Sequence, residues 1–177
     1  MRSKQLLILL FSMLFVVVLT NAPGSYVNGA GGGIAPAATL CDDTEKVVFS
    51  CQLKNAKMVA LCGSSKFTKT QGYLQYRFGL PGKVELEYPQ QRSNFQKVFH
   101  YSHYFRAQVD LTEITFSANG YTYTVFSNYN GEEKPAISDQ GVKVTPASKK
   151  EVSYGCRSKA KADFGDLADV FENESSQ

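Results

Sequence analysis

The residues with the most definite chemistry are four cysteines, Cys41, Cys51, Cys62 and Cys156. Zinc sites usually contain two cysteines separated by two to four residues. The spacings here are ten, eleven and ninety-four residues, so they provide no such pair. An even number of cysteines in an exported chain instead predicts two disulfides, with three alternative pairings. We therefore expect four bridged cysteines, no metal and no other cofactor.

The pairing depends on the register of the first predicted hairpin. If Asn55-Ala56 is its turn, Cys51 and Cys62 lie diagonally across two strands, about 7–8 Å apart, which is long for a disulfide. A turn shifted by one residue would place them directly opposite each other. We favour Cys41–Cys62, which would staple the N-terminal entry onto the second strand. Cys51–Cys156 would then tie the first strand to the last, and long loops gain most in the chain-entropy model.

Two histidines, His100 and His103, are the candidates for acid–base or metal chemistry. Residues three apart on a strand point to opposite faces, so these imidazoles are badly placed to share one metal ion. Ser102 lies between them, but the sequence contains neither an H-E-x-x-H nor a G-x-S-x-G motif. We expect that the protein is not an enzyme, and keep a small hydrolase using His100 or His103 as an alternative.

The aromatic segment around the histidines is the best candidate for a binding surface. Its residues His100, Tyr101, His103, Tyr104 and Arg106 combine aromatic rings, a guanidinium and two titratable imidazoles. Tyrosine is amphipathic and is enriched at binding surfaces. Strands also favour aromatic residues for packing alone, which is the competing structural interpretation. We predict a recognition patch here, and the histidines would make its contacts sensitive to pH.

The elements that position these residues are predicted to be strands. From Lys46 onward apolar residues recur with a period close to two, and turn signals recur at short intervals. Pro81-Gly82 fits a type II turn, and Asn119-Gly120 is a strong hairpin signal. The prediction is an all-β fold, an antiparallel meander closing into a small barrel or sandwich of about eight strands. Helical spacing of Phe164, Leu167 and Phe171 predicts one short C-terminal helix.

The N-terminal residues have the pattern of an export signal. Arg2 and Lys4 precede an apolar run over residues 6–19, and small residues follow it. The run is shorter than the roughly twenty residues that a spanning helix needs. The predicted organisation is a signal peptide at 1–22, a flexible Gly/Ala-rich spacer at 23–40, a disulfide-stapled β domain at 41–160 and a C-terminal tail at 161–177.

The charge of the chain gives no reason to expect an anionic partner. The formal net charge is +3, and removal of Arg2 and Lys4 with the leader leaves +1. We therefore expect no nucleic acid partner and no stable membrane span after the leader is cleaved. The predicted location is periplasmic or secreted, where cysteines oxidise.

Residues 46–131 resemble a family of uncharacterised exported bacterial β proteins. The matching stretches are VVFSCQLKNAKMVALCGS, GYLQYRFGLPGKVELEYP, YSHYFRAQVD and GYTYTVFSN. The chain also has a looser similarity to the small periplasmic β-barrel inhibitors of lysozyme, which carry an early strand cysteine bonded near the C-terminus. Cys51 and Cys156 would match that pair. The inhibitory loop motif of those inhibitors has no counterpart in this sequence.

The predicted function is that of an exported, non-enzymatic binding protein. Its partner would be an unidentified protein or glycan of the cell envelope. One version of this hypothesis is an inhibitor or immunity protein against a cell-wall hydrolase. The alternative is an envelope or surface interaction protein that recognises a glycan or a protein.

Overall fold

The computed structural model describes residues 39–172 of the chain. The predicted signal peptide at 1–22 and the predicted spacer as far as residue 38 lie outside the described residues. Residues 173–177 of the predicted tail also lie outside them.

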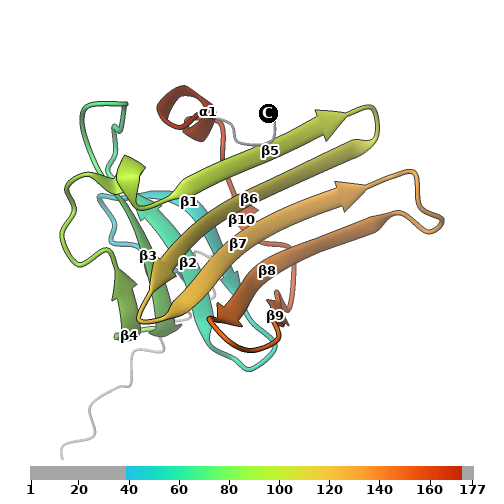
Figure 1. Cartoon of the computed structure of the whole chain (residues 1–177), viewed down its shortest axis with the longest axis horizontal. Helices are drawn as coiled ribbons and strands as arrows, with labels where there is room; N and C mark the ends of the chain where they lie inside the picture. The colour runs from blue at the N-terminus through green and yellow to red at the C-terminus, as the bar shows by residue number, and fades with distance from the viewer. Residues whose placement is uncertain (1–38, 173–177) are drawn as a thin grey trace, which may run out of the picture. The chain divides into compact units, whose positions relative to one another are not determined.

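Two antiparallel sheets of five strands each make up the fold (Figure 1). The first sheet has the order β10-β1-β2-β3-β4 and the second has the order β5-β6-β7-β8-β9. The strands of the first sheet are β1 (Lys46–Gln52), β2 (Met58–Gly63), β3 (Leu74–Leu80), β4 (Lys83–Tyr88) and β10 (Lys161–Ala162). Those of the second are β5 (His100–Arg106), β6 (Val109–Ala118), β7 (Tyr121–Asn130), β8 (Ile137–Pro146) and β9 (Val152–Gly155).

A core of aromatic and aliphatic side chains lies between the sheets. Tyr76 of β3 and Tyr88 of β4 place their rings 4.9 Å and 5.2 Å from the ring of Phe116 on β6. Tyr123 of β7 stacks on the same Phe116 ring at 4.9 Å. Because these contacts join both sheets, the prediction of an all-β fold is confirmed in its sandwich form.

The two sheets differ in length. Strands β6, β7 and β8 have 10 residues each, whereas β1 to β4 have 6 or 7. At about 3.4 Å per residue, the long strands exceed the short ones by about 10 Å. Figure 1 shows β5 to β8 running past the end of the first sheet. One end of the second sheet is therefore not covered by the first.

The segment predicted as a C-terminal tail contributes to this core. Residues 161–162 form β10, which pairs with Phe49 and Ser50 of β1. The predicted helix is present as α1 (Leu167–Val170), and Leu167 is fully buried. The ring of Phe171 packs edge-on at 5.7 Å against Phe95, which lies in the 3-10 helix η1 (Phe95–Lys97). The described part of the tail thus closes one end of the sandwich.

Both favoured disulfides, Cys41–Cys62 and Cys51–Cys156, are present. The first hairpin pairs Cys51 with Val59, and Cys51 packs in the core between the sheets. Cys62 belongs instead to a small cluster with Leu40 and Met58, outside that core. Because Cys51 and Cys62 lie in different clusters, a bridge between them is excluded. The two bridges indicate an oxidising, extracytoplasmic environment.

We predict that the two disulfides stabilise the fold unequally. Cys51–Cys156 closes a loop of 105 residues and Cys41–Cys62 a loop of 21. In the chain-entropy model, the double change Cys51→Ala/Cys156→Ala lowers the free energy of unfolding by about 4–5 kcal/mol. The double change Cys41→Ala/Cys62→Ala lowers it by about 3 kcal/mol. Urea unfolding of both oxidised variants measures this, and an equal or larger loss for the second would contradict it.

Candidate functional site

The five predicted patch residues all lie on β5, an edge strand of the second sheet, but on both of its faces. Tyr101 and His103 are on the face turned toward the first sheet, and their rings are 6.2 Å apart. Tyr101 is buried in the core and packs against Phe171. His100, Tyr104 and Arg106 are exposed and alternate with them, on the opposite face. The structure therefore divides the predicted patch between two surfaces.

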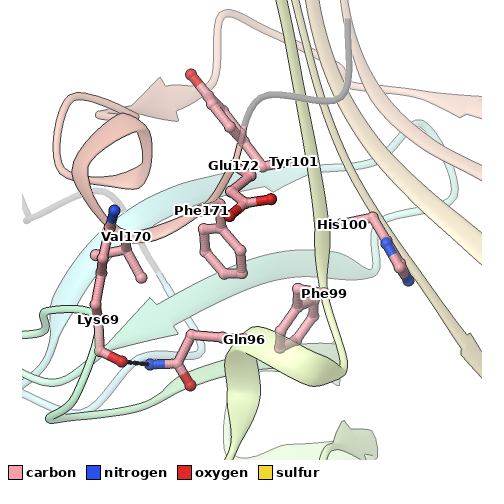
Figure 2. Close-up of a pocket in the computed structure, with 8 residues that line it drawn as sticks. All are labelled: Lys69, Gln96, Phe99, His100, Tyr101, Val170, Phe171 and Glu172. Carbon is pink, nitrogen blue, oxygen red and sulfur yellow. Dashed lines mark hydrogen bonds between the residues drawn. The ribbon is translucent and has the colours of Figure 1, made fainter. Parts of the chain in front are cut away.

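Figure 2 shows the start of β5 beside a hollow of about 340 Å³. His100 and Tyr101 leave the strand in opposite directions, and Phe99 and Phe171 both line the hollow. Phe99 and Phe171 are both buried members of the main core cluster. The hollow is thus a packing gap between η1, β5 and α1, and the two histidine side chains do not converge in it.

The uncovered end of the second sheet brings together a more coherent set of residues. Strand register places Tyr101, Ile114, Val125 and Val142 in one row across β5 to β8, and all four are buried. The next row consists of His103, Thr112, Ser127 and Gln140. The last row consists of Phe105, Asp110, Tyr129 and Ser138. We call these last two rows the end face.

The change of polarity at the end face occurs at the same row on three strands. Ile114 is followed by Thr112 on β6, Val125 by Ser127 on β7, and Val142 by Gln140 on β8. The inner face of the second sheet therefore changes from apolar to polar at the row of His103, in which Thr112 is still buried. Two large rings interrupt this polarity, because Phe105 is 72% exposed and Tyr129 is 46% exposed.

Polar contacts hold the end face in place. His103 Nε2 lies 3.0 Å from Asp110 Oδ1, which joins β5 to β6. The guanidinium of Arg106 makes a two-pronged ion pair with Glu132, which follows β7. Gln140 Nε2 donates to Ser127 Oγ at 2.9 Å. Because both rows lie on paired strands, the two exposed rings are presented on a rigid surface.

Sequence reasoning missed Phe105, Asp110 and Tyr129 as members of one surface. The Asn119-Gly120 hairpin signal was sufficient to place Asp110 opposite Tyr129, since both turn residues have positive φ and the pairing is regular. The turn between β5 and β6 has no such signal. It is formed by Ala107-Gln108, in which Gln108 takes a φ of 62° without being glycine.

The arrangement around His103 has some of the parts of a hydrolase. Asp110 is placed to orient its imidazole, as an acid orients the base of a catalytic triad. Ser102 lies on the opposite face of β5, so the nearest hydroxyl in sequence does not meet this imidazole. In the same row, Thr112 is the direct neighbour of His103, and it is buried.

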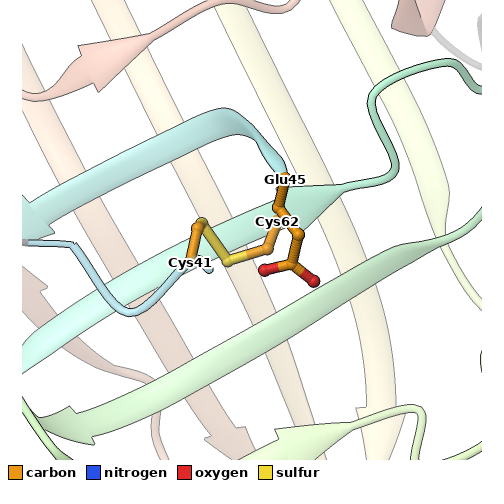
Figure 3. A group of neighbouring side chains, drawn as sticks. All are labelled: Cys41, Glu45 and Cys62. Atoms are coloured by element: carbon orange, nitrogen blue, oxygen red, sulfur yellow. A yellow bond between two sulfur atoms is a disulfide. The ribbon is translucent and has the colours of Figure 1, made fainter. Parts of the chain in front are cut away.

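Figure 3 shows the carboxylate of Glu45 beside the Cys41–Cys62 disulfide. The potential ligand atoms of these three residues lie within 4.8 Å of one another. The two sulfur atoms are bonded to each other, so neither is a thiolate that binds metal. The carboxylate is already occupied, because it accepts from Arg77 Nη2 at 2.9 Å and from the Tyr73 hydroxyl at 2.7 Å. The cluster is therefore a structural one.

This cluster fastens the N-terminal segment onto the outer face of the first sheet. The side chains of Arg77 and Glu45 are only 4% and 1% exposed. Arg77 also donates from Nε to Glu87 at 2.7 Å and from Nη1 to the Leu40 carbonyl at 3.0 Å. Burial opposes the ionisation of Glu45, but hydrogen bonds from Arg77, the Asp42 amide and Tyr73 outweigh it. The result is a lowered pKa for Glu45.

Comparisons of the chain with protein-family models, with curated proteins and with solved structures give no match. Across residues 39–172, no helix has the length and apolar character needed to cross a membrane. The resemblances seen in the sequence therefore remain predictions.

We predict that the stabilising effect of Glu45 is lost in acid. Its lowered pKa means that the ion pair is fully effective above the ordinary value of 4.5 and fails as the pH falls through the folded-state value. At pH 7, Glu45→Gln should lower the free energy of unfolding by about 3–5 kcal/mol, since Arg77 stays buried without its partner. Thermal unfolding of both proteins from pH 7 to pH 3 should show the difference closing below pH 4.5. A difference that is constant with pH would contradict this.

We predict that the rings of the end face add little to stability. Phe105→Ala and Tyr129→Ala should each change the free energy of unfolding by no more than about 1 kcal/mol, because Phe105 is largely exposed and Tyr129 is about half exposed. Phe116→Ala, which opens the core, should cost about 3–5 kcal/mol. Urea unfolding measures all three. A loss above about 2 kcal/mol for either end-face variant would mean that its ring is part of the core.

Proposed function

We propose that this protein is an exported, non-enzymatic binding protein that blocks a cell-wall hydrolase in the periplasm or outside the cell. The observation that carries the proposal is the end face, where Asp110 lies between Phe105 and Tyr129 in one row of paired strands. Large exposed rings on a rigid surface are the usual anchors of protein interfaces. The two disulfides support an extracytoplasmic location.

Inhibition would follow from covering the substrate cleft of the hydrolase. Phe105 lies near the end of β5, and Arg106 beside it is tied to Glu132, so this corner of the sheet is stiff as well as exposed. A stiff anchor loses little conformational entropy on binding, which favours affinity. The edge of β5 adds backbone donors and acceptors, which suit recognition of an extended segment of a partner.

The experiment is a binding and inhibition assay with the disulfide-bonded protein against a panel of lysozyme-type hydrolases. We expect a complex with at least one enzyme and loss of its activity. Phe105→Ala and Tyr129→Ala should each weaken the complex by about tenfold or more, equivalent to about 1.4 kcal/mol. Tyr121→Ala is the matched control, because Tyr121 is 43% exposed at the other end of β7. No complex with any enzyme of the panel would contradict the proposal.

Recognition of an envelope glycan is the second candidate. The observation that favours it is the mixture on the end face of two aromatic rings with a carboxylate and hydroxyl groups. A sugar offers C–H groups that pack on a ring and hydroxyls that bond polar side chains. Titration with soluble peptidoglycan fragments separates the two candidates, because the same two ring variants should then lose glycan binding.

A small hydrolase using His100 or His103 is less well supported. Asp110 is placed to orient His103, but Ser102 lies on the other face of the strand. Substitution of both histidines by alanine tests this alternative, because a hydrolase of this kind would lose its own catalytic activity, and hydrolysis unchanged in the double variant would eliminate it.

A further inference from the structure

A second cavity, of about 440 Å³, lies between the two sheets where the edge strands β4 and β9 meet the hairpin of β1 and β2. We call it the inter-sheet slot. Both sheets line it, with Tyr76, Phe78 and Leu86 from the first sheet and Tyr123, Val144 and Tyr154 from the second. Its volume is in the range of small-molecule sites, and four of these side chains are aromatic.

The side of the slot next to β9 is apolar where a filled core would be covered. Val152 and Tyr154 of β9 are cross-strand partners of Val144 and Val142, and so belong to the inner face of the second sheet. They are nevertheless 48% and 41% exposed. These two side chains stay apolar although they are exposed, whereas at the end face the residues become polar in the row that follows the buried one. The slot is therefore suited to an apolar occupant.

The mouth of the slot already holds a cation against an aromatic wall. Lys57 Nζ lies 5.1 Å from the centre of the Phe78 ring and 2.6 Å from Glu85 Oε2. The faces of aromatic rings carry negative charge density and attract ammonium groups, including those of quaternary ammonium ligands. The chain thus shows, with its own lysine, the combination of a ring face and a carboxylate that recognises an ammonium.

The charges at the slot favour a cationic ligand over an anionic one. The only cation among the lining side chains is Lys57, and Glu85 already neutralises it. Burial raises the pKa of the Tyr76 and Tyr123 hydroxyls, so both stay uncharged phenols inside the slot. An anion would meet the carboxylate of Glu85 and the face of the Phe78 ring. A cation would meet the same groups as attractive partners and would take the place of Lys57.

We propose that the inter-sheet slot binds a small ligand with a quaternary or alkylated ammonium group on an apolar body, and that Lys57 occupies the cation position when no ligand is bound. This site lies apart from the end face, and it does not depend on the proposed function. The aromatic rings and Glu85 hold the ammonium, the apolar walls hold the body of the ligand, and Lys57 swings out to solvent. The slot gives the protein a second binding activity, toward small cations.

The test is calorimetric titration of the disulfide-bonded protein with benzyltrimethylammonium. We expect binding, and we expect the uncharged isostere neopentylbenzene to bind at least threefold more weakly, since it lacks the cation–π attraction. Lys57→Met should tighten binding of the cation about three- to tenfold, because the competing ammonium is removed. Glu85→Gln and Tyr154→Ala should weaken it by a similar factor. Lys83→Met, an exposed change on β4 outside the slot, is the matched control and should have no effect.

Lys57→Met should change the affinity of the slot in opposite directions for cationic and anionic ligands. If the slot takes anionic amphiphiles, then dodecanoate binds the wild type and Lys57→Met weakens that binding, which would overturn the proposal. Equal affinity for the cation and its uncharged isostere, or no binding of the cation to Lys57→Met, would also overturn it. Thermal unfolding of each variant confirms that the fold is retained, and Lys57→Met should lose less than about 1 kcal/mol because its ion pair is partly exposed.

Discussion

The difference in strand length between the two sheets determines most of what this protein presents to its surroundings. A sandwich buries an inner face only where the opposite sheet covers it. Strands of 10 residues in β6, β7 and β8 face strands of 6 or 7 residues. The inner face of the long strands therefore extends about 10 Å beyond the short ones, and this part must either stay apolar and exposed or become polar. At the end face these residues are polar except for Phe105 and Tyr129. Packing within the sandwich does not explain why these two exposed positions hold large rings.

The remaining features hold this unequal sandwich together. The Cys51–Cys156 bridge joins β1 of the first sheet to the segment that follows β9 of the second. The Cys41–Cys62 bridge and the buried ion pair of Arg77 with Glu45 hold the N-terminal segment on the outer face of the first sheet. Cys156 borders the end face, because its amide donates to the Gln140 carbonyl at 2.7 Å. Phe105 and Tyr129 lie in the outermost row and are exposed, so we expect variants at these two rings to change binding more than stability.

The sequence predicted those elements that have a local signal. Pro81-Gly82 and Asn119-Gly120 do form turns, with positive φ at Gly82, Asn119 and Gly120, and the favoured disulfides are present. What it missed lacks such a signal. A strand of two residues at 161–162 has no periodicity to detect, and the bulge between Val47 and Phe49 shifts which side chains face the core.

It was harder to predict which residues share one surface than to predict the strands that carry them. The patch on β5 was read along one strand, and a strand divides consecutive residues between two faces. The end face draws its residues from four strands, and the register of β5 on β6 depends on Ala107-Gln108, which resembles no standard turn sequence. Choosing between a barrel and a sandwich likewise required knowledge of which strands remain edges.

If the end face is the binding surface, its two rings, Phe105 and Tyr129, are exposed in the free protein and covered in the bound one. Hydroxyl-radical footprinting of side chains measures this directly, with the free protein and with its hydrolase complex compared residue by residue. We predict rapid labelling of Phe105 and Tyr129 in the free protein and protection of both in the complex, while Tyr121 is labelled equally in the two. Slow labelling of the pair in the free protein, or unchanged labelling in the complex, would contradict it.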